Sequence, residues 1–186
     1  MAFFLPPLHV TSYQLAPQLY RVVGNISRAV DTEYFQFLLK TDDDCYLNTA
    51  RIINELSQLQ QDGLSERIWW GRFRHNWAVE THGKWSERDY TAPVYPKFAC
   101  GAGYVISQDV VLWLASNADQ LYAYQGEDVS MGIWLSAIHP YYIDDPFWQC
   151  DTDCISAMYA APDFDPPELR QLWSYMEQCD DPCGCS

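Results

Sequence analysis

The stretch YFQFLLKTDDDCYLNTARIINELSQLQQDG, residues 34–63, constrains the fold more than any other part of the chain. Its apolar start runs for seven positions without a turn residue, as expected for a strand that is buried on both faces. Three consecutive aspartates follow, and then an amphipathic helical pattern that Asn48 caps and Gly63 ends. A strand, a carboxylate loop and a helix in this order predict an α/β fold with an open sheet, in which ligands bind beyond the carboxyl ends of the strands.

The three aspartates, Asp42, Asp43 and Asp44, are the first candidate site. Adjacent like charges repel, so one interpretation is a solvated turn or a helix cap. The other is a metal site, because carboxylate oxygens suit Mg2+ or Mn2+, and one or two carboxylates leave coordination positions for substrate phosphates. The position directly after a buried strand favours the metal site.

A second acidic pair, Glu127 and Asp128, lies in GEDVSMGIWL at the predicted start of a helix. Both side chains could simply favour the positive end of the helix. The alternative is a catalytic base: an aspartate partly shielded by Trp134 that takes a proton from an incoming hydroxyl.

The remaining patterns predict further strands, helices and loops. CGAGYVIS, residues 100–107, lacks the third glycine of a dinucleotide-binding loop, and its two glycines indicate a close approach to a ligand or a tight bend. In WWGRFRHNW, residues 69–77, tryptophans that face outward could stack on sugar rings. The other predictions are a helix over 17–30, a strand over 67–73, a polar hairpin turning at 82–83, an extended segment leading into a small-residue loop at 100–103, a helix from Ser107 to Asn117, a helix opening at 126–128, and a last helix from Pro166 with Leu169, Leu172, Trp173 and Met176 inward.

Length and charge limit the class of protein. The 186 residues, 48% of them hydrophobic, suit one domain core, and we expect residues 1–186 to form a single domain with 150–186 as its Cys-rich extension. No window reaches the roughly 18 apolar residues of a membrane span. The net charge is -14, and residues 98–186 carry one basic residue against fourteen acidic ones, so nucleic acid is not an expected partner.

Seven cysteines, five of them in the last 37 residues, indicate covalent or metal staples in the C-terminal part. We favour disulfides; the alternative is a zinc knuckle built from Cys150, Cys154, Cys179 and Cys183. The odd count leaves at least one thiol free or paired with another chain. Asn25 begins a glycosylation sequon, which fits a secretory compartment.

Three motifs, FLLKTDDDCYLN, YPKFACGAGYVIS and QGEDVSMGIWL, resemble in order and spacing the β-1,3-galactosyltransferase family, glycosyltransferase family 31. WWGRFRHNWAVETHGKW and the ending LWSYMEQCDDPCGC are similar to a branch that transfers N-acetylgalactosamine. The resemblance implies a GT-A-type domain that inverts the anomeric centre. It further implies a UDP-sugar donor such as UDP-N-acetylgalactosamine or a related UDP-hexose, Mn2+ (or Mg2+), a glycan acceptor in protein O-glycosylation, and the lumen of the Golgi or endoplasmic reticulum.

The same resemblance assigns roles to residues of this chain. It implies Asp128 as the catalytic base with Glu127 beside it, and Asp42 and Asp44 of the DxD element as metal ligands. The implied donor or acceptor contacts are Asp42, Asp43, Trp70, Gly101, Gly103 and Tyr104.

Relatives in this family carry further nucleotide-binding βα units and a membrane anchor before the region that corresponds to Pro17, so we expect a C-terminal portion of the domain. Without those units, one edge of the predicted strand at 34–40 would have no neighbouring strand, unless the segment MAFFLPPLHV pairs there. The alternative function is a catalytically inactive, carbohydrate- or partner-binding remnant of the family. A metal-dependent phosphohydrolase is disfavoured because the chain has no second, histidine-rich cluster of metal ligands.

Overall fold

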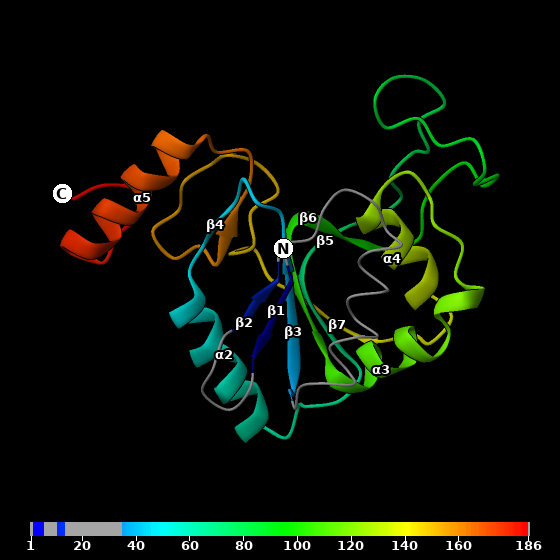
Figure 1. The fold of residues 1–186 in the computed structure, drawn as a ribbon, viewed down its shortest axis with the longest axis horizontal. Helices are drawn as coiled ribbons and strands as arrows, with labels where there is room; N and C mark the ends of the chain where they lie inside the picture. The colour runs from blue at the N-terminus through cyan, green and yellow to red at the C-terminus, as the bar shows by residue number, and fades with distance from the viewer. Residues whose placement is uncertain (1, 6–10, 14–34, 186) are drawn as a thin grey trace.

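The computed structural model describes residues 2–5, 11–13 and 35–185, and it combines a mixed sheet with helices on both faces (Figure 1). The predicted helix over 17–30 and the sequon at Asn25 lie outside the described residues. The elements are β1 (Ala2–Leu5), β2 (Thr11–Tyr13), β3 (Phe37–Thr41), β4 (Tyr46–Leu47), α2 (Thr49–Gln61), β5 (Ile68–Arg74), β6 (Phe98–Ser107), α3 (Gln108–Ser116), the 3-10 turn η1 (Ala118–Gln120), α4 (Glu127–Leu135), β7 (Tyr141–Asp144), β8 (Ala160–Ala161) and α5 (Pro166–Cys179).

The six-stranded sheet has the order β2-β1-β3-β6-β5-β7. The β5–β7 pair is parallel, and the other neighbouring pairs are antiparallel. The predicted strand in YFQFLLK is β3, and all five of its residues are buried. β1 pairs with the edge of β3 that would otherwise be unpaired, with Phe4 opposite Leu38. The sequence allowed for such a pairing.

Two layers of side chains cover the sheet, because neighbouring residues of a strand point to opposite faces. Figure 1 shows α2 on one face and α3 with α4 on the other. Phe37 and Leu39 pack with Ile52 of α2, whereas Leu38 joins the larger cluster that includes α3 and α4. None of the helices in the described ranges has both the length and the apolar composition to cross a membrane.

The predicted helix after the aspartates is confirmed as α2. The Asn48 side chain accepts a hydrogen bond from the backbone N–H of Arg51, 3.0 Å away, which satisfies one free donor of the first turn. Gly63 follows the helix with φ +80°, a left-handed conformation that glycine adopts without strain. The predicted starts of α3, α4 and α5 are also confirmed, and in α5 Asp165 and Glu168 form a capping box.

The small-residue loop predicted at 100–103 is wrong, because these residues lie inside the ten-residue strand β6. β6 lies inside the sheet, where it pairs with β3 on one side and β5 on the other. Its glycines make room for side chains from elsewhere in the chain: a Cβ on Gly103 would lie 2.9 Å from Cζ3 of Trp148. The absence of side chains therefore serves packing across the strand, and the predicted tight bend does not occur.

Residues 75–97, which we call the excursion, leave the sheet between β5 and β6 as an extended loop (Figure 1). The turn at Gly83 is confirmed, with φ +89°. The two long strands of a hairpin are not formed: the two sides of the excursion meet at the isolated bridge between Ala78 and Val94 and, nearer the turn, through the Glu87 N–H, which donates to the Glu80 carbonyl oxygen at 2.8 Å. The excursion is therefore a folded loop, held at its base by that bridge.

Three disulfides join Cys100 to Cys150, Cys154 to Cys183, and Cys179 to Cys185. They confirm the preference for disulfides and contradict the zinc knuckle, since all four of its proposed ligands are consumed. Cys45 is the free cysteine, in keeping with the odd count.

The last helix, α5, differs from its prediction in one side chain. Leu172 is buried as expected, but Trp173 is 43% exposed, and its ring lies tilted against that of Tyr46 with 5.3 Å between ring centroids.

Helix α4 lies against β6 at a glycine. A Cβ on Gly132 would lie 2.6 Å from Cβ of Phe98 and 2.9 Å from the Lys97 carbonyl oxygen. We expect Gly132→Ala to lower the free energy of unfolding by about 1 to 2 kcal/mol, because the clash outweighs the better helix propensity of alanine. Thermal unfolding measures this, with Asn54→Ala on the exposed face of α2 as control. An equally stable Gly132→Ala protein would contradict this close packing.

Candidate active site

The loop of aspartates begins where β3 ends, at the edge of the sheet. Its first anchor is Thr41, whose hydroxyl donates a 2.6 Å hydrogen bond to the Ala102 carbonyl oxygen on β6. Asp42, Asp43 and Asp44 are exposed, and the side chain of Asp42 keeps 53% of its surface accessible. These carboxylates are therefore accessible to a ligand while their backbone is fixed to the sheet.

Lys40, the residue two positions before Asp42, connects the two acidic motifs. Its side chain is only 7% exposed, and its ammonium lies 2.9 Å from Oδ1 of Asp42 and 2.7 Å from Oε2 of Glu127. It also donates to the Gly101 carbonyl oxygen at 3.1 Å. Burial lowers the pKa of Lys40, but Glu127 and Asp42 together raise it above its ordinary value. Lys40 is thus a permanently charged bridge between the aspartate loop and the start of α4.

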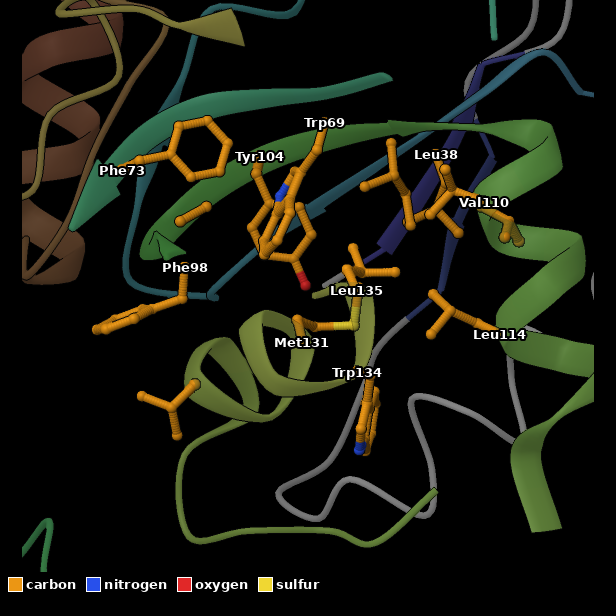
Figure 2. Packing of buried hydrophobic residues seen from close by; sticks show 14 of the residues in the cluster. Leu38, Trp69, Phe73, Phe98, Tyr104, Val110, Leu114, Met131, Trp134 and Leu135 are labelled. Atoms are coloured by element: carbon orange, nitrogen blue, oxygen red, sulfur yellow. The ribbon is translucent and has the colours of Figure 1, made fainter. Parts of the chain in front are cut away.

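Glu127 is held from two sides. Its Oε2 forms the ion pair with the Lys40 ammonium, and its Oε1 accepts a hydrogen bond from the phenol of Tyr104 on β6. Figure 2 shows the Tyr104 side chain pointing from β6 toward α4. Burial, and then the Glu127 charge, raise the pKa of Tyr104 well above its ordinary value, so the phenol remains a donor. Both carboxylate oxygens of Glu127 are engaged, which fixes its position.

Asp128, the next residue, has a different environment. Burial, and then the neighbouring Glu127 charge, raise its pKa from 3.8 to about 6, against smaller opposing effects of the Val129 N–H, Lys40 and Arg74. The Val129 N–H donates to Oδ1 at 2.8 Å. At neutral pH Asp128 is therefore mostly ionised and more basic than an exposed aspartate, which are the properties of a general base.

Trp70 does not lie at this site, and its predicted contact with a donor or acceptor is corrected. The residue is 0% exposed and packs against Trp148 and Tyr159 in the core on the α2 side. Its indole N–H donates to Asp145 at 3.2 Å. Of the tryptophans in the 69–77 motif, Trp69 and Trp70 are buried and Trp77 is 43% exposed, and Trp85 further along the excursion is 55% exposed.

The predicted contacts on β6 divide between the site and the core. Gly101 faces the site, because a Cβ there would lie 3.3 Å from Oδ2 of Asp42. Tyr104 reaches the site through its hydroxyl. Gly103 packs against Trp148 and belongs to the core. The roles predicted for these residues toward a substrate stay predictions.

Sequence reasoning did not select Lys40 as a site residue. The signal was present, since a lone lysine at the end of an apolar strand, directly before three aspartates, needs a partner if it is buried.

The aspartate loop has the donor atoms that a hard divalent cation prefers. Within the described ranges, no group of three or more His, Cys, Asp or Glu side chains converges on one point. An ion that keeps open positions for substrate phosphates needs only one or two protein carboxylates, and Asp42 and Asp44 supply two exposed ones. The residues therefore fit Mg2+ or Mn2+ of that kind, and they do not fit a fully protein-enclosed ion.

Comparison with known proteins agrees with this geometry. Residues 17–145 match the family model described as galactosyltransferase. The chain is 52% identical over 84% of its length to human UDP-GalNAc:beta-1,3-N-acetylgalactosaminyltransferase 2, and 49% identical over 85% to the zebrafish protein of that name. It is 31% identical over 72% of its length to mouse beta-1,3-galactosyltransferase 6.

The match covers 31% of the human relative, so the chain spans about a third of the length of that protein. Within this span lie the aspartate loop, the glycines of β6 and the acidic start of α4. The chain therefore belongs to the galactosyltransferase family, glycosyltransferase family 31.

Proposed function

We propose that the chain carries the phosphate- and acceptor-side part of an inverting β-1,3-hexosyltransferase site that uses a UDP-sugar and a divalent cation. The observation that supports this most is the link through Lys40, which brings Asp42 of the aspartate loop and Glu127 of α4 to one ammonium group. Asp128, with a pKa raised to about 6, lies directly beside that link.

Asp42 and Asp44 would hold Mn2+ or Mg2+, which when bound supplies Lewis-acid stabilisation of the leaving diphosphate, worth several kcal/mol. Asp43, exposed between them, and Gly101 would line the donor side. Lys40 keeps Asp42 oriented, and Glu127, fixed by Lys40 and Tyr104, would contact the donor sugar beside the base.

In the proposed reaction Asp128 removes the proton from the acceptor hydroxyl. The acceptor oxygen forms a bond to the anomeric carbon as the bond from that carbon to the β-phosphate oxygen breaks. UDP leaves with the electron pair, and the single displacement inverts the anomeric centre. General-base assistance of this kind typically contributes about 100- to 10,000-fold to the rate.

The relatives indicate which substrates to test first. Several are UDP-GalNAc:beta-1,3-N-acetylgalactosaminyltransferases and one is a beta-1,3-galactosyltransferase. We therefore propose UDP-N-acetylgalactosamine as the donor, with UDP-galactose as the next choice, and a glycan of a glycoprotein as the acceptor, in protein O-glycosylation. The three disulfides fit an oxidising compartment, which we propose is the lumen of the Golgi or endoplasmic reticulum.

The alternative, a binding remnant without catalysis, is less favoured. A remnant that binds sugar rings by stacking needs exposed aromatic rings but no base. The buried environment that raises the pKa of Asp128 and the double anchoring of Glu127 have no use in such a module.

Titration calorimetry of UDP into the oxidised chain, with and without Mn2+, tests the donor site. We expect heat of binding with Mn2+, and at least ten-fold weaker binding without the ion or in Asp44→Ala, because the loss of one charge-assisted contact costs about 1.5 to 3 kcal/mol. Asp153→Ala, which removes an exposed carboxylate far along the chain, is the matched control.

Binding that depends on Mn2+ and on Asp44, but not on Asp153, supports the proposal and leads to the transfer assay with UDP-N-acetylgalactosamine. A folded chain that binds neither UDP nor Mn2+ would contradict a functional donor site in this chain and favour the remnant.

A further inference from the structure

The excursion contains a buried carboxylate that the proposed chemistry does not use. Glu87 is 5% exposed, and within the described part of the chain no basic side chain forms an ion pair with it. Instead two backbone groups donate to it: the Asp89 N–H to Oε1 at 2.6 Å and the Gln125 N–H to Oε2 at 2.8 Å. A buried carboxylate that is satisfied by backbone donors fixes the segments that supply them.

One of these segments leads directly into the acidic pair. Residues 121–126 form the loop before α4, and Glu87 holds it at Gln125, two residues before Glu127. A second bond in the same place joins the Tyr122 hydroxyl to Asp89 Oδ2 at 2.7 Å. The excursion is thus attached to this loop by Glu87 and Asp89, which form what we call the clamp.

The other side of the loop is fixed by α4 itself. The Ser130 hydroxyl donates to the Gly126 carbonyl oxygen at 2.6 Å and accepts from the Tyr124 N–H at 3.1 Å, and the Trp134 indole donates to the Tyr122 carbonyl oxygen at 2.8 Å. A Cβ on Gly126 would lie 2.8 Å from Oδ1 of Asp128, so the loop passes directly beside that carboxylate.

The excursion also contributes rings near the acidic pair. Tyr90 stacks on Tyr95 with 5.4 Å between centroids, and meets the edge of Tyr124 at 5.5 Å. Burial raises the pKa of the Tyr95 phenol, and the charges of Glu87 and Asp128 add to this effect. The excursion therefore places aromatic rings against the loop that leads into Asp128.

We propose that Glu87 is a positioning residue for Asp128: by clamping the excursion to the loop before α4, it holds that carboxylate in its water-poor setting. The inference rests on the proposed function in one respect: a change in the setting of Asp128 affects sugar transfer only if Asp128 is the catalytic base. The clamp itself is a structural claim that can be tested without any transferase assay.

The test replaces Glu87 without changing its charge. Glu87→Asp is one methylene shorter and cannot reach the Asp89 and Gln125 N–H groups together. Tyr122→Phe removes the second bond of the clamp from an exposed side chain and leaves every buried charge in place. Glu80→Asp, on an exposed side chain of the same excursion, is the matched control.

The readout is the titration midpoint of the Asp128 carboxyl carbon, followed by NMR in the full chain. In wild type we expect about 6. In Glu87→Asp we expect the midpoint to fall by about one pH unit, because water replaces the clamped loop and the burial that raises the pKa weakens. Tyr122→Phe shifts it in the same direction by less, and Glu80→Asp leaves it unchanged. The Gln125 amide exchanges faster with solvent in Glu87→Asp.

The other charged or titratable groups around Asp128 stay in place in these variants. They are Glu127 on α4, Lys40 on β3, Arg74 on β5, Tyr104 on β6 and Tyr95 in the excursion.

An Asp128 midpoint that stays at its wild-type value in folded Glu87→Asp and Tyr122→Phe overturns the inference. The proposed function fails by a different result, namely wild-type chain that neither binds UDP nor transfers sugar. A shifted midpoint in a chain without transferase activity would keep the clamp and refute the proposed function alone.

Discussion

Replacing Asp128 with asparagine is expected to lower the rate of sugar transfer by about 100- to 10,000-fold, because the acceptor hydroxyl then loses its base. The same change is expected to make the folded chain more stable above pH 6. The folded-state pKa of Asp128, about 6, lies above its ordinary value of 3.8, so the folded chain prefers the protonated form. As pH rises through this range, the wild-type chain loses stability and the neutral asparagine does not.

The difference between these two pKa values corresponds to about 3 kcal/mol, at about 1.4 kcal/mol for each pKa unit. Thermal unfolding at pH 4 and pH 8 measures it: we expect a higher Tm for Asp128→Asn at pH 8 and nearly equal values at pH 4. Asp119→Asn, on an exposed aspartate of η1, is the control. Transfer at the wild-type rate by Asp128→Asn would rule out the base, and equal Tm values at pH 8 would rule out its desolvation.

Local patterns predicted most of the helices and the buried strand. Both ends of α2 are predictable because Asn48 and Gly63 act on their own neighbours in the sequence. β3 is predictable because seven residues in a row lack a turn former. The disulfides were expected from the crowding of cysteines at the C-terminus, but not their pairing. Cys100 pairs with Cys150, fifty positions away, and no local rule specifies such a partner.

The errors occur where distant parts of the chain decide. The small residues at 100–103 predict a loop when read alone, because their packing partners, Trp148 and Asp42, are remote in sequence. The resemblance implies Trp70 as a donor or acceptor contact, yet β5 is buried on both faces over its first four residues, and Trp70 lies in the core. Side-chain direction in such a strand follows from the layers above and below it.

The acidic residues of the candidate site are predictable from the sequence, whereas the buried side chains that connect them are not. The aspartate loop and the pair at 127–128 were both selected from sequence. Neither Lys40 nor Glu87 was, because each becomes informative only when its partners are known: Glu127 is 87 positions from Lys40 in the sequence, and Gln125 is 38 from Glu87.

Lys40→Met is expected to be the most destabilising single change in the candidate site. Methionine fills similar space but leaves Glu127, with 18% of its side chain exposed, without its counter-charge. Removing one partner of a largely buried ion pair costs about 3 to 5 kcal/mol, because the other charge stays buried and unpaired. Chemical denaturation at pH 7 measures the loss, and Lys84→Met, which removes an exposed lysine over the Trp85 ring, should change stability by less than about 0.5 kcal/mol.

A double variant separates the unpaired charge from lost packing. Adding Glu127→Gln to Lys40→Met removes the buried charge while keeping an oxygen that accepts the Tyr104 hydroxyl. If the penalty comes from the unpaired carboxylate, the double variant recovers at least half of the lost stability, since contacting residues couple by about 0.5 to 3 kcal/mol. If instead the two losses simply add, Lys40 contributes through packing alone, and the link between the aspartate loop and α4 is not electrostatic.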